Sequence, residues 1–136
     1  MDVLDEEVKE FQLKLEAIPK EFLEQGSIEV YGNLKIVVTS FDRIDRMAFL
    51  KGNTIYVSVR ARRYLEFVLR YIIAHELAHT LVKKHTWRFW KIVKIIYPEY
   101  EKGKEELLKI IREELMMKRV KRLDRTSRRL RSSRSS

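Results

Sequence analysis

The spacing of apolar residues divides the chain into helical and extended segments. Near the start they recur every three or four positions, which predicts a helix over residues 2–17 that Pro19 interrupts. From residue 34 to residue 59 they alternate with polar residues, and this period of two is typical of strands. Helical spacing returns after residue 62. The predicted strands are 34–40, 47–50 and 54–59, and the later predicted helices are 62–84, 87–97 and 101–123.

The order of these elements predicts the fold class. A helix comes first, a short sheet follows and helices fill the rest, an order that is typical of α+β domains. Lys51, Gly52 and Asn53 separate the second and third strands, which predicts a hairpin. We therefore expect one α+β domain over residues 1–123, in which a small antiparallel or mixed sheet packs on the helix 62–84, with N- and C-terminal helices around it.

The helix predicted over residues 62–84 is unusually apolar. Between residues 67 and 82 only Arg70 and Glu76 carry a formal charge. A helix that is apolar nearly all round is typical of the interior of a protein. Polar side chains on such a helix need partners, because burying an unpaired charge is costly. A metal ion would satisfy this glutamate and its two neighbouring histidines together.

Two histidines and this glutamate have the spacing of a metal site. His75 and His79 are four residues apart, so they lie on one helical face, one turn above the other. Glu76 lies about 100° round the helix, too far to be a straightforward ligand but close enough to deprotonate a water held by the metal. This H-E-x-x-H arrangement is that of zinc hydrolases. Two core histidines bonded to the backbone, beside a glutamate paired with an arginine, are the structural alternative.

His85 is the candidate third ligand, because catalytic zinc usually has three protein ligands and one open position. On a continuous helix it would lie about 240° from His79, so the helix must end between them. Lys83 and Lys84 suit a helix C-terminus, and Thr86 suits the N-cap of a following helix. His85 is therefore predicted to lie in the turn between two helices. A solvated position in this lysine-rich corner is the alternative.

The stretch from residue 75 to residue 90 resembles the YgjP-like metallopeptidases, relatives of the SprT-like proteases. Its sequence HELAHTLVKKHTWRFW is similar to the family pattern H-E-L-x-H, five residues, then H-S-x-x-F-W, with Thr86 in place of the usual serine. Pro98 followed by Tyr100 is similar to the proline and aromatic residue that close the next helix in that family. The likeness covers about residues 54–100 and implies a minimal zincin-like fold.

This resemblance also implies an activity. His75, His79 and His85 would bind zinc (Zn2+) and Glu76 would be the catalytic base, which makes the chain an HExxH zinc metallopeptidase. A peptide or protein substrate would lie as an extended strand along an exposed sheet edge, and the hairpin over residues 47–59 is the candidate edge.

Two roles in this site have several candidates. In gluzincins, a competing family of zincins, a downstream glutamate replaces the third histidine, although no E-x-x-x-D signature is clear here and His85 is preferred. The candidate carboxylates are Glu99, Glu101, Glu105 and Glu106. The candidate donors for an oxyanion are Tyr97, Tyr100 and Arg88, and the sequence selects none of them.

The charge of the chain is concentrated at its C-terminal end. The net charge is +9, and residues 118–136 alone hold nine Lys or Arg and one acid. The other 117 residues hold 20 basic and 19 acidic residues. The Arg- and Ser-rich composition predicts a disordered basic tail over residues 124–136. Such a tail binds nucleic-acid phosphates or only keeps the protein in solution.

Composition narrows the class of protein further. There is no cysteine, so neither disulfides nor thiolate ligands are available. The acidic N-terminus lacks a signal-peptide core and no stretch approaches the length of a membrane span, so a cytoplasmic protein is expected. Two other functions stay open beside the peptidase. One is a metal-dependent hydrolase of a non-peptide substrate, such as a nucleoside triphosphate, and the other is a nucleic-acid-binding protein with structural zinc or none.

Overall fold

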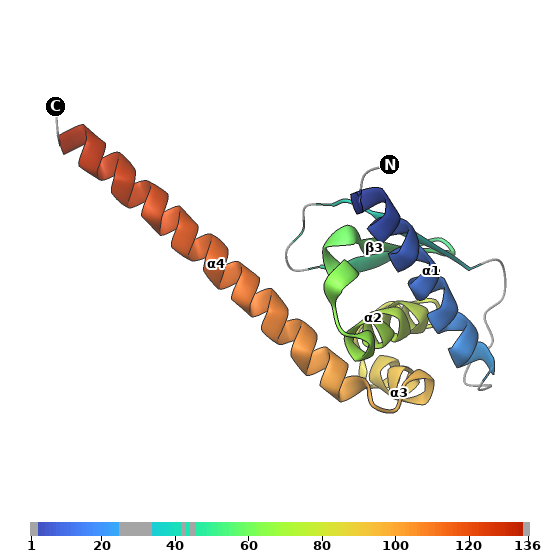
Figure 1. Ribbon diagram of the computed structural model, residues 1–136. Coiled ribbons are helices and arrows are strands. Elements are labelled where there is room, and N and C mark those ends of the chain that lie inside the picture. The colour runs from blue at the N-terminus through green and yellow to red at the C-terminus, as the bar shows by residue number, and fades with distance from the viewer. Residues whose placement is uncertain (1–2, 25–33, 42, 44–45, 135–136) are drawn as a thin grey trace.

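The computed structural model describes residues 3–24, 34–41, 43 and 46–134 (Figure 1). In chain order the elements are α1 (Val3–Glu24), β1 (Lys35–Thr39), β2 (Ala48–Lys51), β3 (Thr54–Ser58), the 3-10 helix η1 (Val59–Arg63), α2 (Glu66–His79), α3 (Trp87–Ile96) and α4 (Tyr100–Arg134). The predicted α+β class is confirmed, as is the small mixed sheet beside the helix that carries the H-E-x-x-H sequence.

The strands in the described residues form one sheet in the order β1-β3-β2. β1 runs parallel to β3, whereas β2 runs antiparallel to β3 and pairs Phe49 with Tyr56. Gly52 turns the chain between β2 and β3 with a φ of 62°, in the left-handed region that favours glycine. The predicted hairpin is therefore confirmed, and β2 lies at the edge of the sheet as far as the structure describes it.

Helix α2 is the buried centre of the fold. It contacts α1, β2, α3 and α4, and the side chains of Leu69, Ile73 and Leu77 are fully buried. Burying a Leu or Ile side chain contributes about 1.5–3 kcal/mol, so packing fixes this helix from several sides. The apolar sequence of the helix predicted this burial. Packing on several sides therefore restricts movement of α2 and of the functional side chains that it carries.

Pro19 does not interrupt α1, so that prediction was wrong. The helix continues through the proline to Glu24, although the ring removes one backbone donor from the helical ladder. Ile18 and Phe22, on either side of it, are both buried. In proteins most helical stability comes from packing of the apolar face, and here that packing offsets the lost hydrogen bond.

Helix α2 is shorter than the predicted helix over residues 62–84. The residues before Glu66 form η1 and a short connection instead. At the other end α2 stops at His79, and the hydroxyl of Thr80 donates a hydrogen bond to the Leu77 carbonyl at 2.6 Å. Such a bond from side chain to backbone competes with continuation of the helix. The early end of α2 leaves residues 80–86 free to turn back toward the helix that they follow.

Helix α4 is longer than predicted. It was expected to end near residue 123, but it continues to Arg134, so residues 124–134 are helical where a disordered tail was predicted. Arg favours helix, and neither Gly nor Pro follows Gly103 in this helix to stop it. Figure 1 shows its first turns beside α2 and α3 and the rest projecting from the body. None of the described helices, α4 included, combines the length and apolar character that crossing a membrane requires.

Gly103 allows α4 to lie close against α2. A Cβ atom at this position would lie 2.6 Å from Cβ of Tyr71 and 2.7 Å from the carbonyl oxygen of Phe67. Both distances are shorter than van der Waals contact, so any side chain here would push the two helices apart. The close approach brings Leu107 and Ile111 of α4 into contact with the core around α2.

Candidate metal centre

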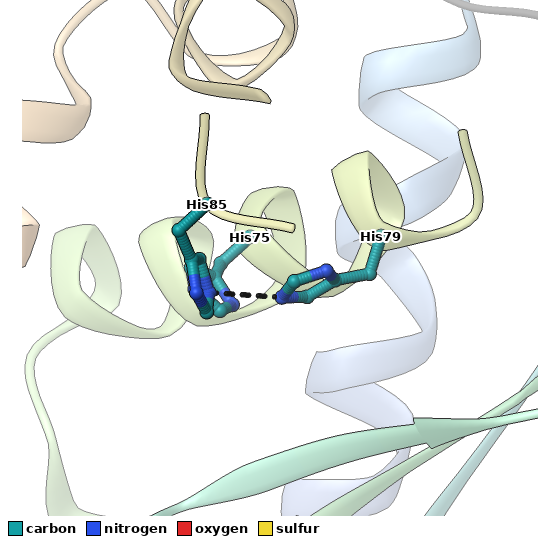
Figure 2. A group of neighbouring side chains, drawn as sticks. All are labelled: His75, His79 and His85. Atoms are coloured by element: carbon teal, nitrogen blue, oxygen red, sulfur yellow. Dashed lines mark hydrogen bonds between the residues drawn. The ribbon is translucent and has the colours of Figure 1, made fainter. Parts of the chain in front are cut away.

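Three histidines converge at the C-terminal end of α2 (Figure 2). His75 and His79 come from successive turns of α2, and His85 comes from the segment between α2 and α3. Figure 2 shows the three rings pointing toward one another. Thr86 then occupies the N-cap of α3 as predicted, although its side chain makes no capping hydrogen bond. The structure therefore places His85 in the turn between two helices and brings it back to the helix that precedes it.

The distances between the Nε2 atoms fit a tetrahedral metal site. Nε2 of His85 lies 3.1 Å from Nε2 of His75 and 3.2 Å from Nε2 of His79. Zinc–nitrogen bonds of about 2.0–2.1 Å at tetrahedral angles place ligand nitrogens about 3.3 Å apart. Lone pairs of neutral imidazoles repel one another at this distance unless a proton or a cation lies between them. The donor set therefore fits one divalent ion held by three nitrogens.

Hydrogen bonds on the other side of two rings orient them for this task. Nδ1 of His79 lies 3.2 Å from the carbonyl oxygen of Val82, and Nδ1 of His75 lies 3.3 Å from Oε1 of Glu76. A neutral imidazole has one N–H. If Nδ1 carries that proton and donates it to the Val82 carbonyl or the Glu76 carboxylate, Nε2 keeps a free lone pair for a metal. Outer partners of this kind fix the tautomer and ring orientation of metal-binding histidines.

The surroundings favour the neutral form of two of the histidines. Burial lowers the pKa of His79, and the charge of the neighbouring His75 lowers it further. Burial and the same neighbour also lower the pKa of His85. Metal binding requires the neutral imidazole, so these shifts favour binding of a cation over binding of a proton.

Phe89 packs behind all three imidazoles. Its ring centroid lies 5.1 Å from that of His75, 4.5 Å from that of His79 and 4.9 Å from that of His85. The side chain comes from α3 and is fully buried. An apolar ring at this position limits movement of the histidine rings and keeps water away from their rear faces.

Glu76 is the one charged side chain that is buried among the described residues, with 5% of its surface exposed. Its Oε1 atom faces Nδ1 of His75. A buried carboxylate is costly without partners, so its position beside the imidazoles is typical of a functional group rather than a structural one. The glutamate that the sequence predicted as a base therefore lies next to the three histidines.

In the part of the chain that the structure describes, two cavities adjoin Glu76, and both include Arg46 in their walls. The hairpin cavity has a volume of about 510 Å³, and its walls include Phe49, Asn53, Glu76, His79 and Lys83. The helix cavity has a volume of about 240 Å³, and its walls include Tyr71, His75, Glu76, His85 and Leu108. Between them the two cavities contact all three histidines, so a molecule lying in either one would be next to the candidate site.

The four carboxylates considered as alternative third ligands do not join this group. Glu99, Glu105 and Glu106 border a separate hollow with Phe67, and Glu101 is exposed on α4. Among the described residues, the potential ligands that come within 4.8 Å of one another are the three histidines. His85 is therefore the third candidate ligand that the structure places at the site.

Comparison with known proteins agrees with this geometry. Residues 48–110, which include the histidines and Glu76, match the family described as "YgjP-like, metallopeptidase domain". The matched part of the chain is similar to YgjP-like metallopeptidase domains. No curated protein matched it.

Two solved structures are similar to this chain. One is the metallopeptidase zymogen of Pyrococcus abyssi abylysin, with 25% identity, a TM-score of 0.51 and coverage of 79% of this chain and 93% of that chain. The other is the metallopeptidase zymogen of Methanocaldococcus jannaschii jannalysin, with 19% identity, a TM-score of 0.49 and coverage of 83% and 98%. The first similarity supports the α+β fold of a metallopeptidase for this chain.

Tyr71 is a residue beside the candidate site that the sequence analysis missed. It lies one turn before His75 on α2 and contributes to the helix cavity with Glu76 and His85. Burial raises the pKa of the Tyr71 hydroxyl, and the charge of Glu76 raises it further, so the hydroxyl stays protonated. Its spacing of four residues from the first histidine was the signal that could have identified it.

The donors that the sequence proposed for an oxyanion lie elsewhere. The ring of Tyr97 packs on Phe22, with centroids 6.0 Å apart, and that of Tyr100 stacks on Trp90 at 5.9 Å. Arg88 is exposed on α3. None of the three borders the hairpin cavity or the helix cavity. Tyr71, by contrast, borders the helix cavity.

Proposed function

We propose that the YgjP-like domain is a zinc-dependent peptidase in which His75, His79 and His85 hold the metal and Glu76 is the general base. The observation that carries this proposal is the convergence of three Nε2 atoms, with His85 3.1 and 3.2 Å from the other two, beside a buried carboxylate. Three protein ligands with a position left open are typical of catalytic zinc, whereas structural zinc has four.

Each residue then has a separate task. The three histidines hold the ion, and Phe89 keeps their rings in place. When bound, zinc would supply Lewis-acid chemistry, which makes water more acidic and polarises a peptide carbonyl. Glu76 accepts the proton of the attacking water on its carboxylate and later gives it to the leaving amine. The protonated hydroxyl of Tyr71 donates a hydrogen bond toward the oxygen on which negative charge develops.

The edge strand β2 supports a peptide as the substrate. Its inner side pairs with β3, and no strand covers its outer side among the described residues. Residues of this hairpin form walls of both cavities at the histidines. An extended peptide can add to such an edge through main-chain hydrogen bonds, which hold it with little regard for its sequence. The bond to be cut would then lie across the site.

Metal removal tests this proposal. The protein should contain close to one zinc per chain, and dialysis against a chelator should abolish cleavage of a fluorescently labelled casein. Readdition of zinc should restore the activity, whereas magnesium, a metal that prefers oxygen ligands, should not. Release of phosphate from nucleoside triphosphates is measured on the same samples. Zinc-dependent phosphate release without casein cleavage would favour the non-peptide hydrolase, and neither activity in a zinc-loaded protein would favour structural zinc.

We also propose that the distal part of α4 binds nucleic acid, as a second function of the chain. Residues 118–136 hold nine Lys or Arg and one acid. Side chains from residue 118 to residue 125 are exposed on a helix that projects from the body (Figure 1). A projecting cationic helix can follow a phosphate backbone without disturbing the peptidase site, and the attraction would weaken as salt rises.

Neutralising this helix should reduce retention on DNA and its dependence on salt. Each lost phosphate contact lowers the slope of log affinity against log salt by about 0.9 for duplex DNA. The test variant carries glutamine at three exposed positions of α4: Lys118, Lys121 and Arg125. The matched control carries glutamine at three exposed lysines of α1: Lys9, Lys14 and Lys20. Equal slopes for the two variants would remove the proposal.

A further inference from the structure

The hairpin cavity and the helix cavity follow one another along strand β2. Met47 and Ala48 contribute to the helix cavity, Arg46 borders both cavities, and the hairpin cavity is bordered further along by Phe49, Leu50, Gly52 and Asn53. Successive residues of a strand advance by about 3.3 Å, so a peptide paired with β2 passes from one cavity to the other within a few residues. The two cavities are therefore candidate binding sites for side chains of one peptide.

The hairpin cavity is cationic. Arg46 and Lys83 contribute to its walls, and among the described wall residues Glu76, the proposed base, is the one carboxylate. Neither cation has an ion pair with a carboxylate in the part of the chain that the structure describes. The bound metal would add more positive charge at the histidines. A carboxylate is the group that this cavity would favour, because it gains charge-assisted hydrogen bonds that a neutral or cationic group does not.

The helix cavity has the opposite character. Seven of its eleven described wall residues are apolar or aromatic, and they come from the β2 hairpin with the residue before it, α2 and α4. Met47 and Ala48 lie on the hairpin side, Ile72 on α2, and Leu107 and Leu108 on α4. Leu108 is 47% exposed, which leaves apolar surface at the cavity for another group to cover. A large apolar side chain would remove this surface from water.

We propose that the cleft selects peptides that place a carboxylate in the hairpin cavity and a large apolar side chain in the helix cavity, on either side of the bond to be cut. This inference rests on the proposed peptidase function and specifies its substrate class. The carboxylate has two possible sources, an Asp or Glu side chain within the peptide or the free C-terminus of a peptide. Arg46 and Lys83 determine the preference at one end of the cleft, and Leu108 contributes to it at the other.

Charge reversal at Lys83 tests the hairpin cavity. Amidated peptides that differ only in Glu, Gln or Lys at a scanned position are compared by kcat/KM, and cleavage positions are read by mass spectrometry. The wild type should prefer Glu over Lys at one position by about 5- to 10-fold, as expected for exposed charge pairs. Lys83→Glu should remove or invert that preference. Lys84→Glu is the matched control, because Lys84 is the next residue, is exposed and borders neither cavity.

A further peptide distinguishes the two sources of the carboxylate. It has Gln at the scanned position but ends there in a free carboxylate instead of an amide. Preference for this peptide over its amidated form, without preference for internal Glu, would assign the cavity to a C-terminus. Preference for internal Glu would assign it to a side chain. Equal rates for all four peptides in the wild type would overturn the cationic subsite.

A pair of leucines on α4 tests the helix cavity. Leu108→Lys should lower the preference for Leu or Phe over Ala at the second scanned position by about 10-fold, the loss expected when part of an apolar side chain is no longer buried. Leu115→Lys is the control, because Leu115 is also 47% exposed on the same helix but borders neither cavity. The same loss in both variants, or in neither, would overturn the apolar subsite.

A binding measurement separates this inference from the proposed function. Peptide affinity is measured by fluorescence anisotropy on zinc-loaded Glu76→Gln protein, with and without Lys83→Glu. The preference for a carboxylate should appear in the dissociation constants even if the wild type cleaves no peptide, and in that case only the peptidase function fails. Cleavage by the wild type with no preference in either measurement would leave the peptidase function and overturn the inference.

Discussion

Glu76→Gln is expected to retain the metal and lose hydrolysis. The amide has the size of the carboxylate, and its oxygen can still accept a hydrogen bond from Nδ1 of His75, which lies 3.3 Å from Oε1 in the wild type. It cannot take up a proton from water. Removing a general base slows the reaction by about 10²- to 10⁴-fold, so kcat/KM should fall by at least about 10²-fold. Zinc content should stay near one per chain.

The control for this variant is Glu99→Gln, which makes the same chemical change at an exposed carboxylate bordering a hollow away from the histidines. Metal content is measured by elemental analysis beside the kinetics, and thermal unfolding checks that both variants fold. Full activity in Glu76→Gln would remove this residue from the mechanism. Loss of zinc together with activity would instead mean that the carboxylate acts by orienting His75.

The convergence of the histidines could be predicted because it is a local property. His75 and His79 share a face of α2 through helical periodicity alone, and the residues between His79 and Thr86 indicated a turn. All three imidazoles lie within eleven consecutive residues, so few tertiary contacts are needed to bring them together. The roles of these residues and of Glu76 stay predictions until metal content and activity have been measured.

The walls of the cleft could not be predicted, because they depend on contacts between distant segments. Arg46 precedes β2, Tyr71 lies on α2 and Leu108 lies on α4, yet all three border the helix cavity. These residues come together because α4 packs closely against α2 at Gly103. The pattern of apolar residues does not predict which helix this glycine contacts. The parallel pairing of β1 with β3 is likewise a long-range contact that alternation cannot specify.

The predicted ends of helices were wrong where local preferences and tertiary packing oppose each other. Pro19 is a local helix breaker, but burial of its neighbours Ile18 and Phe22 keeps α1 intact. In α4 the composition after residue 123 favoured disorder, whereas the helix propensity of its arginines favours continuation to Arg134. A composition poor in apolar residues indicates that a segment cannot form a hydrophobic core of its own. The end of α4 needs no such core, because it continues a helix whose first turns are already packed.

His85→Ala is expected to weaken zinc binding by at least about 100-fold, because even the outer partners of metal ligands contribute about 10- to 100-fold. His85 supplies the Nε2 that lies 3.1 and 3.2 Å from the other two, so without it only two nitrogens remain on α2. Two ligands are fewer than catalytic zinc sites use. Zinc content after dialysis should fall well below one per chain, and competition with a chromophoric chelator measures the affinity.

Thermal unfolding gives a second, independent readout of the same variant. A ligand present at about 100 times its dissociation constant stabilises the folded state by about 2.7 kcal/mol. At that zinc concentration a 100-fold weaker site would gain only about 0.4 kcal/mol, so the metal-dependent rise in Tm should nearly vanish. The metal-free proteins should unfold alike, because His85 is exposed. Lys84→Ala in the same loop, with Glu105→Ala and Glu106→Ala on α4, serve as controls. Zinc affinity that survives His85→Ala but is lost in either glutamate variant would assign the third ligand to α4.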